Sequence, residues 1–131
     1  MIVADASVIL EVLLQTPAGR AATTRLLSDD ETVHAPALVD LEVAQVLRRY
    51  VMRGELYAAR AQVALDMLAA FPMQRYMHEP LVRRIWELRE NLTAYDAAYV
   101  ALAEGLRAPL ITCDKRLAGA PGIRATVELI D

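Results

Sequence analysis

Cysteine and histidine are scarce in this chain of 131 residues, which has one cysteine, Cys113, and two histidines, His34 and His78. A single cysteine excludes a disulfide within the chain, and the lack of a Cys/His cluster argues against a zinc site. Cys113 lies in an apolar run with neither histidine near it in sequence. We therefore expect a buried structural thiol there rather than a nucleophile.

Long apolar runs are missing as well. No such run approaches the roughly 18 residues that a membrane span requires. The N-terminal segment MIVADASVILEVLLQ carries Asp5 and Glu11 within its apolar residues and no basic residue before them, which argues against a signal peptide. No repeat and no Pro/Gly-rich linker divides the chain. We therefore expect a single cytoplasmic domain over residues 1–131, with no membrane partner.

An excess of positive charge is also absent, because the net charge is −3. Composition alone therefore gives no sign of nucleic-acid binding. Lys115 is the only lysine among 14 basic residues, a preference for Arg that a GC-rich genome explains before a phosphate-binding role does. The 56% hydrophobic content is high for a small domain, so part of the apolar surface is expected to meet a partner. Trp86 fits either the core or a dimer interface.

The apolar segments alternate between two periodicities. Short strands are predicted at residues 1–4, 32–35, 73–77, 110–113 and 125–130, and helices at 7–15, 19–29, 36–54, 55–71, 80–90 and 94–104. Ser7 is the predicted N-cap of the first helix. This alternation predicts an α/β fold with a parallel, doubly wound sheet and helices on both faces.

Two acids follow predicted strands directly. Asp5 comes after the first strand and Asp114 after the strand at 110–113, and each has a hydroxyl residue two positions away, Ser7 and Thr112. The carboxyl ends of strands in an open parallel sheet are where ligands bind. On local grounds alone each acid fits the commoner role of a helix N-cap.

Two further acids interrupt apolar helix faces. Glu42 lies one turn from Leu38 and Val46, and Asp96 interrupts the nearly all-apolar segment 94–103. Thr93 is a predicted N-cap, so Asp96 also fits as a first-turn acid that favours the helix dipole. An unpaired charge on a core-facing stripe is costly, which favours a shared site for both acids with those at the strand ends.

A shared site for Asp5, Glu42, Asp96 and Asp114 requires cations. Carboxylates brought close together repel one another and raise their pKa values, and a divalent ion removes that conflict. Oxygen ligands without His or Cys favour Mg²⁺ or Mn²⁺. Such an ion activates water and aligns attack on phosphorus, and it reverses the charge of an acidic cleft that a polyanion enters.

Four segments, VADAS, DLEVAQVL, TAYDAAYVALAE and LITCDKRL, carry a family resemblance over the whole chain in order and approximate spacing. They resemble the PIN-domain ribonucleases and, more narrowly, the VapC toxins of bacterial VapBC toxin–antitoxin pairs. The resemblance implies a PIN-like three-layer sandwich around a mostly parallel sheet. It also implies endonucleolytic cleavage of tRNA or ribosomal RNA that depends on Mg²⁺ or Mn²⁺, toxicity in the cell, a homodimer, and a cognate VapB-like antitoxin that covers the site.

Residue by residue, the resemblance places catalytic and metal-binding roles on Asp5, Glu42, Asp96 and Asp114. Ser7 and Thr112 would orient ligands and bound water. One departure is that some members place a further acid shortly after the last Asp, where this chain has Lys115 and Arg116. These two residues fit either contacts to RNA phosphates or a solvated helix start.

The segment RRYVMR adds Arg48, Arg49 and Arg53, which fit phosphate contacts or, in preference, an exposed helix face.

Two other classes of protein remain as alternatives. A receiver-like phospho-acceptor domain has a similar length and strand-end acids, but it would need an acidic pair after the first strand and a lone Asp after a middle strand. This chain has the single Asp5 in the first place. A catalytically silent interaction domain of the same fold is the second alternative, and the presence of all four acids argues against it.

Overall fold

Five strands form one parallel sheet in the computed structural model, which describes all residues, 1–131. The strands are β1 (Ile2–Ala4), β2 (Val33–Pro36), β3 (Met73–Tyr76), β4 (Leu110–Thr112) and β5 (Val127–Leu129). Their order across the sheet is β3-β2-β1-β4-β5, so the sheet grows outward from β1 in both directions. The strand order therefore reverses between β1 and β4.

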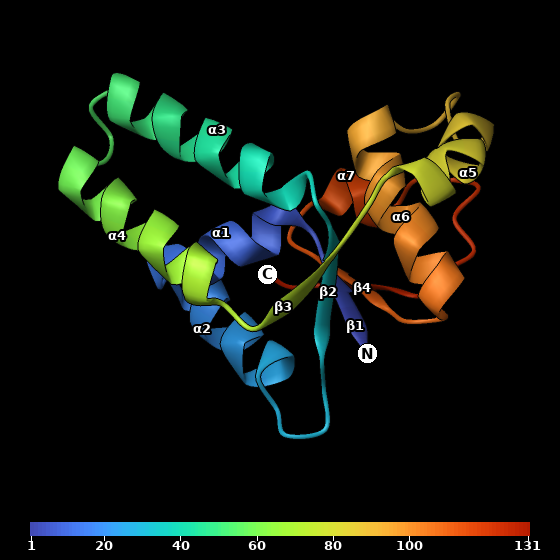
Figure 1. The fold of residues 1–131 in the computed structure, drawn as a ribbon, viewed down its shortest axis with the longest axis horizontal. Helices are drawn as coiled ribbons and strands as arrows, with labels where there is room; N and C mark the ends of the chain where they lie inside the picture. The colour runs from blue at the N-terminus through green and yellow to red at the C-terminus, as the bar shows by residue number, and fades with distance from the viewer.

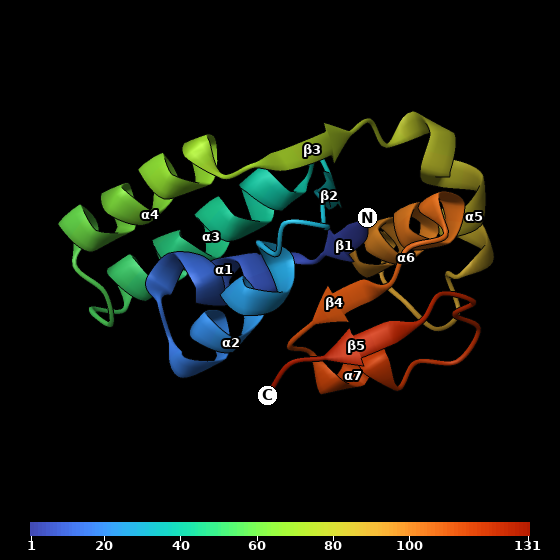
Figure 2. The ribbon, with the colours of Figure 1, turned by 90° about the horizontal axis from the view of Figure 1, so that it is seen from below.

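Helices cover both faces of this sheet (Figures 1 and 2). They are α1 (Ala6–Leu14), α2 (Pro17–Leu26), α3 (Val39–Met52), α4 (Ala58–Ala70), α5 (Val82–Glu87), α6 (Ala94–Leu106) and α7 (Lys115–Ala118), with a 3-10 turn η1 (Glu79–Leu81). α1 to α4 lie on one side of the sheet, and α5 and α6 on the other. The predicted α/β class, the parallel sheet and the helices on both faces are confirmed.

The core extends over both faces of the sheet, and α6 covers one of them. All residues of β1 are buried, and every residue of α6 from Ala97 to Ala103 is buried as well. Alanine makes up much of this stretch, so the helix backbone approaches β1, β2 and β4 closely. The first turn of α6 is more exposed and carries Asp96, which lies at the rim of the core rather than in it.

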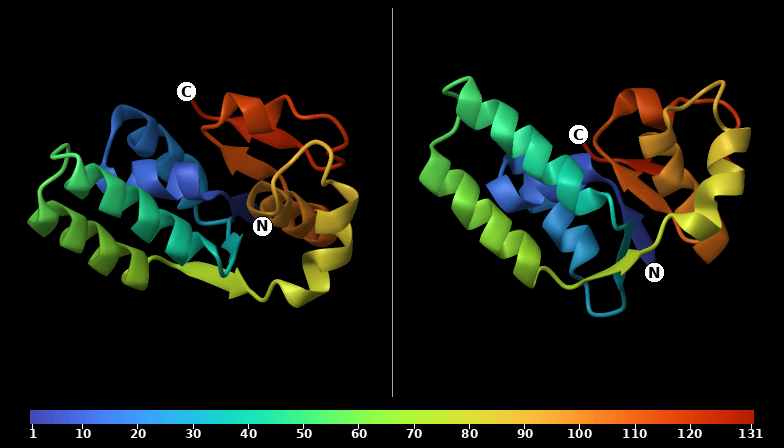
Figure 3. Two further views of the ribbon diagram at one scale, coloured as in Figure 1. Left: turned by 90° about the horizontal axis from the view of Figure 1, so that it is seen from above. Right: turned by 45° about the horizontal axis from the view of Figure 1, so that its top comes forward.

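A hairpin of α3 and α4 projects beyond the sheet (Figures 1 and 3). Gly54 turns the chain after α3 with a φ of +71°, a conformation that residues with a Cβ rarely adopt. The inner face of α3 packs on α1 through Val39, Val43 and Leu47, all buried. Leu41 on α3 is 76% exposed.

Two local predictions were wrong. Ser7 is not the N-cap of α1, because Asp5 takes that position and accepts a hydrogen bond from the Val8 N–H. The helix predicted at 80–90 is η1 followed by the short α5, which ends at Glu87. The chain turns there because Leu88, 2% exposed, enters the core and its carbonyl accepts two N–H groups from the following turn.

No helix of the structure combines the length and apolar character that crossing a membrane would take.

Candidate functional site

The point where the strand order reverses places two acids together. Asp5 follows β1 and Asp114 follows β4, and these two strands pair side by side. Ligands of open parallel sheets bind at the carboxyl ends of strands at such a reversal. A cleft of about 720 Å³ opens there, and Asp5, Glu42, Asp96 and Asp114 all line it. The structure thus brings the four predicted acids to one cavity.

Asp5 is the most deeply buried of the four, with 6% of its surface exposed. Its Oδ1 accepts hydrogen bonds from Ser7 Oγ at 2.6 Å and from the Val8 N–H at 3.1 Å, and its Oδ2 accepts one from Thr112 Oγ1 at 2.5 Å. Burial raises the pKa of Asp5 against the lowering effect of these hydrogen bonds, and the charge of Asp96 adds to the rise. The carboxylate is therefore held in one orientation by neutral donors.

Ser7 and Thr112 join the ends of β1 and β4. Ser7 Oγ accepts the Cys113 N–H at 3.0 Å, and Thr112 Oγ1 accepts the Asp114 N–H at 2.9 Å. Ser7 lines the cleft, whereas Thr112 is fully buried behind Asp5 and does not. Any effect of Thr112 on a bound ligand therefore passes through Asp5.

Cys113 lies behind the site as a half-buried thiol that packs against the core. Burial raises the pKa of this thiol to about 11, so it stays protonated at neutral pH and is a poor nucleophile.

Glu42 enters the cleft from α3 and is held by a residue of α6. The Tyr99 hydroxyl, on a side chain 1% exposed, donates a hydrogen bond of 2.6 Å to Glu42 Oε1. Burial raises the pKa of Glu42, and the charges of Asp96 and Asp5 raise it further, while the bond from Tyr99 lowers it. Burial raises the pKa of Tyr99, and the hydrogen bond to Glu42 raises it further. The phenol therefore keeps its proton and remains a donor. Glu42 Oε2 has no protein partner.

Asp96 and Asp114 are bridged by a cation from the chain itself. Arg116 Nη2 lies 3.0 Å from Asp96 Oδ2 and 3.3 Å from Asp114 Oδ2, and the Arg116 side chain is 73% exposed. Asp114 Oδ1 also caps α7 by accepting the Arg116 N–H at 2.9 Å. Thr93 caps α6 as predicted, accepting the Asp96 N–H at 3.2 Å. Lys115 is exposed and makes no ion pair.

The donor set fits a hard divalent cation, although the side chains as placed do not yet surround one. No three Asp, Glu, His or Cys side chains lie close enough together to hold a metal ion. The guanidinium of Arg116 lies between Asp96 and Asp114, a position where a cation is attracted to both carboxylates. A metal that bridged these two Oδ2 atoms would take the place of Arg116. Carboxylate oxygens without nitrogen or sulfur ligands suit Mg²⁺ or Mn²⁺.

Several residues of the cleft were not predicted as site residues. Tyr99 lies one turn from Asp96 on the same face of α6, and that spacing was the only sign of it in the sequence. Glu11, half-buried, also lines the cleft and accepts a very short hydrogen bond from Thr16 Oγ1. Gln45 and Tyr95 complete its exposed edge.

The PIN domain family model matches residues 2–123. Ribonuclease VapC12 of Mycobacterium tuberculosis is 45% identical over 130 residues, with 99% of each chain covered. The chain belongs to the PIN-domain family and, within it, to the VapC ribonucleases. Ribonuclease VapC1 of the same species is 42% identical to this VapC-family chain, covering 98% of it and 96% of the relative.

Solved structures show the same fold. VapBC2 from Rickettsia felis, bound to a DNA fragment from its promoter, matches with a TM-score of 0.74 at 16% identity, with 100% of both chains covered. PAE2754 from Pyrobaculum aerophilum matches with a TM-score of 0.70 at 21% identity, covering 96% of this chain and 81% of the other. The predicted PIN-like sandwich and the resemblance to VapC toxins are confirmed.

Proposed function

We propose that this VapC-family chain is a metal-dependent endoribonuclease toxin that cleaves RNA phosphodiester bonds and is inhibited by a VapB-like antitoxin. The observation that carries the proposal is the convergence of Asp5, Glu42, Asp96 and Asp114 in one cleft at the reversal of strand order. Relatives covering almost the whole chain are named ribonucleases, which supports RNA as the substrate. The substrate class is tRNA or ribosomal RNA.

Asp5, Asp96 and Asp114, joined by Glu42, would hold Mg²⁺ or Mn²⁺. Such an ion supplies a water of lowered pKa and polarises the phosphate. Asp5 is fixed by Ser7 and Thr112, so its direction toward the cleft is set before any ligand arrives. Glu42 is fixed at Oε1 by Tyr99, which leaves Oε2 to accept a hydrogen bond from a water or to bind the ion.

Arg116 has two partners in this proposal. It pairs with Asp96 and Asp114 in the free protein, and once released from them it meets an RNA phosphate at the mouth of the cleft, with Lys115 beside it. The exchange is feasible because the Arg116 side chain is 73% exposed and its ion pairs are weak in water.

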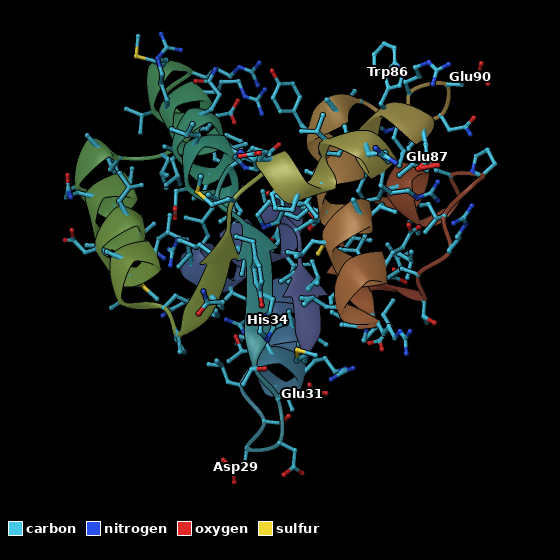
Figure 4. All side chains as sticks on the ribbon, turned by 45° about the vertical axis from the view of Figure 1, so that its right-hand side comes forward. Asp29, Glu31, His34, Trp86, Glu87 and Glu90 are labelled. Atoms are coloured by element: carbon cyan, nitrogen blue, oxygen red, sulfur yellow. The ribbon has the colours of Figure 1, made fainter.

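The partners proposed are a VapB-like antitoxin and a second copy of the chain in a homodimer. Solved structures of the same fold include toxin–antitoxin complexes from Rickettsia felis and Klebsiella pneumoniae, which supports the antitoxin. Trp86 of α5 is 66% exposed, with the Arg89 guanidinium 4.7 Å from its ring centre, and its side chain points outward at the rim of the molecule (Figure 4). It therefore belongs to the surface and not to the core, which leaves it available to a dimer interface.

RNA cleavage by the purified chain, free of any antitoxin, tests the proposal. Bulk tRNA and ribosomal RNA are incubated with the wild type in Mg²⁺, in Mn²⁺ and in EDTA. The matched variants are Asp96→Asn in the cleft and Asp29→Asn in the loop at the opposite end of the sheet (Figure 4). Each substitution removes one negative charge with little change in size.

We expect metal-dependent cleavage that Asp96→Asn lowers more than about a hundredfold, since loss even of a group supporting a metal ligand costs 10–100-fold. Asp29→Asn should cleave RNA at the same rate as the wild type. A folded wild type that binds RNA but cuts neither substrate in either metal would favour the silent interaction domain instead. Equal activity of Asp96→Asn and Asp29→Asn would remove the acidic cleft from the mechanism.

A further inference from the structure

The cleft continues from the acids along one stripe of α3. Leu38, Glu42, Gln45 and Arg49 all line it, at positions that fall on one face of a helix. Glu42 and Arg49 are seven residues apart, which separates their Cα atoms by roughly 10 Å at 1.5 Å per residue. The wall that α3 gives to the cleft therefore carries Glu42, near Asp5 and Asp96, at its acidic end and Arg49 at the other end.

Arg49 is the only basic residue among the 16 that line the cleft. Its side chain is exposed and takes part in no ion pair and no side-chain hydrogen bond. Several other arginines are engaged by acids, among them Arg25, Arg75, Arg84 and Arg116. Arg49 therefore keeps its full donor capacity free beside the cleft.

The neighbouring arginines of the same helix do not share this position. Arg48 and Arg53 are exposed but do not line the cleft. Arg48 lies on another face of α3, and Arg53 lies one turn beyond Arg49, at the C-cap of the helix. The sequence pattern gave the three arginines of RRYVMR one shared interpretation. The structure shows that they occupy different positions relative to the cleft. Arg48 differs from Arg49 only in the face it occupies, so it serves as a matched control.

We infer that Arg49 is a phosphate anchor for the RNA strand, and this inference rests on the proposed function. With the scissile phosphate at the acidic end, the strand runs along α3 and places a neighbouring phosphate against the Arg49 guanidinium. A guanidinium donates two parallel hydrogen bonds to phosphate oxygens, which fixes the strand's position as well as attracting it. Gln45 lies between the two ends and offers a donor and an acceptor to the intervening nucleotide.

An anchor at this distance also counters a problem of charge. Five acids line the cleft (Asp5, Glu11, Glu42, Asp96 and Asp114), and they repel a polyanion wherever a bound metal does not neutralise them. Arg49 supplies attraction that does not depend on the metal. The strand is then held at Arg49 as well as at the acidic end, and Arg49 takes no part in the cleavage.

RNA binding in a background that does not cut the RNA tests this anchor. The probe is fluorescein-labelled bulk tRNA, and its affinity for Glu42→Gln protein in Mn²⁺ is measured by anisotropy over a range of salt concentrations. Arg49→Gln, Arg49→Lys and Arg48→Gln are each added to that background. Both positions, 48 and 49, are exposed, and thermal unfolding of each variant checks that the fold is kept.

Arg49→Gln should weaken tRNA binding about tenfold, the loss expected for a hydrogen-bonded charge contact. The slope of log affinity against log salt should also become shallower by about 0.7, as for one phosphate contact to a single strand. Arg48→Gln should change affinity less than about twofold, and Arg49→Lys should recover the salt slope but only part of the affinity.

Equal losses in Arg49→Gln and Arg48→Gln would overturn the anchor, because they would show only the effect of overall charge. Absence of any tRNA binding in the background protein would overturn it too. Cleavage by the wild type is scored separately. If the wild type cuts no RNA while tRNA binding depends on Arg49 and not on Arg48, the proposed cleavage fails and the anchor stands.

Discussion

The two halves of the acidic cleft are stabilised in different ways. Asp5 and Glu42 are buried or half-buried, and neutral hydroxyls from Ser7, Thr112 and Tyr99 hold them. Their pKa values are raised, first by burial. Asp96 and Asp114 instead face Arg116, an exposed cation that bridges them.

This difference separates a rigid half from an exchangeable half. The hydroxyls cannot neutralise Asp5 and Glu42, so negative charge accumulates there in the free protein at a cost in stability. The charge on Asp96 and Asp114 is partly balanced by Arg116, an exposed side chain that can move away from them. A divalent ion would lower the electrostatic cost at Asp5 and Glu42, and it would take the place of Arg116 at Asp96 and Asp114.

The largest expected effect comes from the rigid half. Glu42→Gln should lower RNA cleavage more than about a hundredfold while raising the Tm of the metal-free protein by about 3–5 °C, the shift that roughly 1 kcal/mol produces in a domain of this size. The gain arises because glutamine removes a charge whose burial is unfavourable. A fall in Tm in EDTA, measured by thermal unfolding, would contradict the claim that this half is strained by charge.

The pH dependence of that gain follows from the raised pKa of Glu42. A group whose pKa is higher in the folded than in the unfolded protein favours the fold at low pH and loses this contribution as pH rises through the folded value. The Tm difference between Glu42→Gln and wild type should therefore be small below the ordinary value of 4.5 and grow above it. Unfolding scans of both proteins in EDTA at several pH values measure it, and a difference that shrinks as pH rises would be the wrong sign.

A smaller effect is expected when the hydroxyl that holds Glu42 is removed. Tyr99→Phe keeps the buried ring but deletes the donor to Glu42 Oε1. We expect cleavage to fall about 10–100-fold, as for other supports of metal ligands, and the affinity for Mn²⁺ to weaken with it. Tyr57→Phe is the control, since Tyr57 is 85% exposed and does not line the cleft. Activity unchanged in Tyr99→Phe would show that Glu42 needs no support from α6.

The smallest effect belongs to the exchangeable half. Arg116→Gln removes the cation that competes with a metal for Asp96 and Asp114, so Mn²⁺ affinity should rise, by no more than about fivefold because exposed ion pairs are weak in water. Lys115→Gln removes the same charge without an ion pair and should change affinity less. Calorimetric titration of both variants decides between competition and mere overall charge, and weaker binding in Arg116→Gln would rule out competition.

Parts of this site were predictable from local sequence patterns. Asp5 and Asp114 follow short apolar strands, and a parallel sheet brings the ends of such strands to one edge. Glu42 and Asp96 stood out because each interrupts an apolar helix face. Both kinds of sign depend on residues close by in the sequence, where periodicity is informative.

Other parts depend on contacts that periodicity does not encode. Tyr99 reaches Glu42 across 57 residues of sequence, and that pairing requires the relative positions of α3 and α6. The ion pairs of Arg116 depend on the rotamer of its side chain. Asp5, and not Ser7, is the N-cap of α1 because the chain turns directly after β1. Arg49 could be distinguished from Arg48 only once the residues that line the cleft were known.

The most direct test of the central claim is a calorimetric titration of Mn²⁺ into the chelator-treated wild type, Asp96→Asn and Asp29→Asn. Asp29 lies outside the cleft, so its variant controls for the loss of one negative charge. We expect saturable binding to the wild type and to Asp29→Asn, and binding that is lost or at least tenfold weaker in Asp96→Asn. Equal binding by all three proteins, or none by the folded wild type, would contradict a metal site formed by these acids.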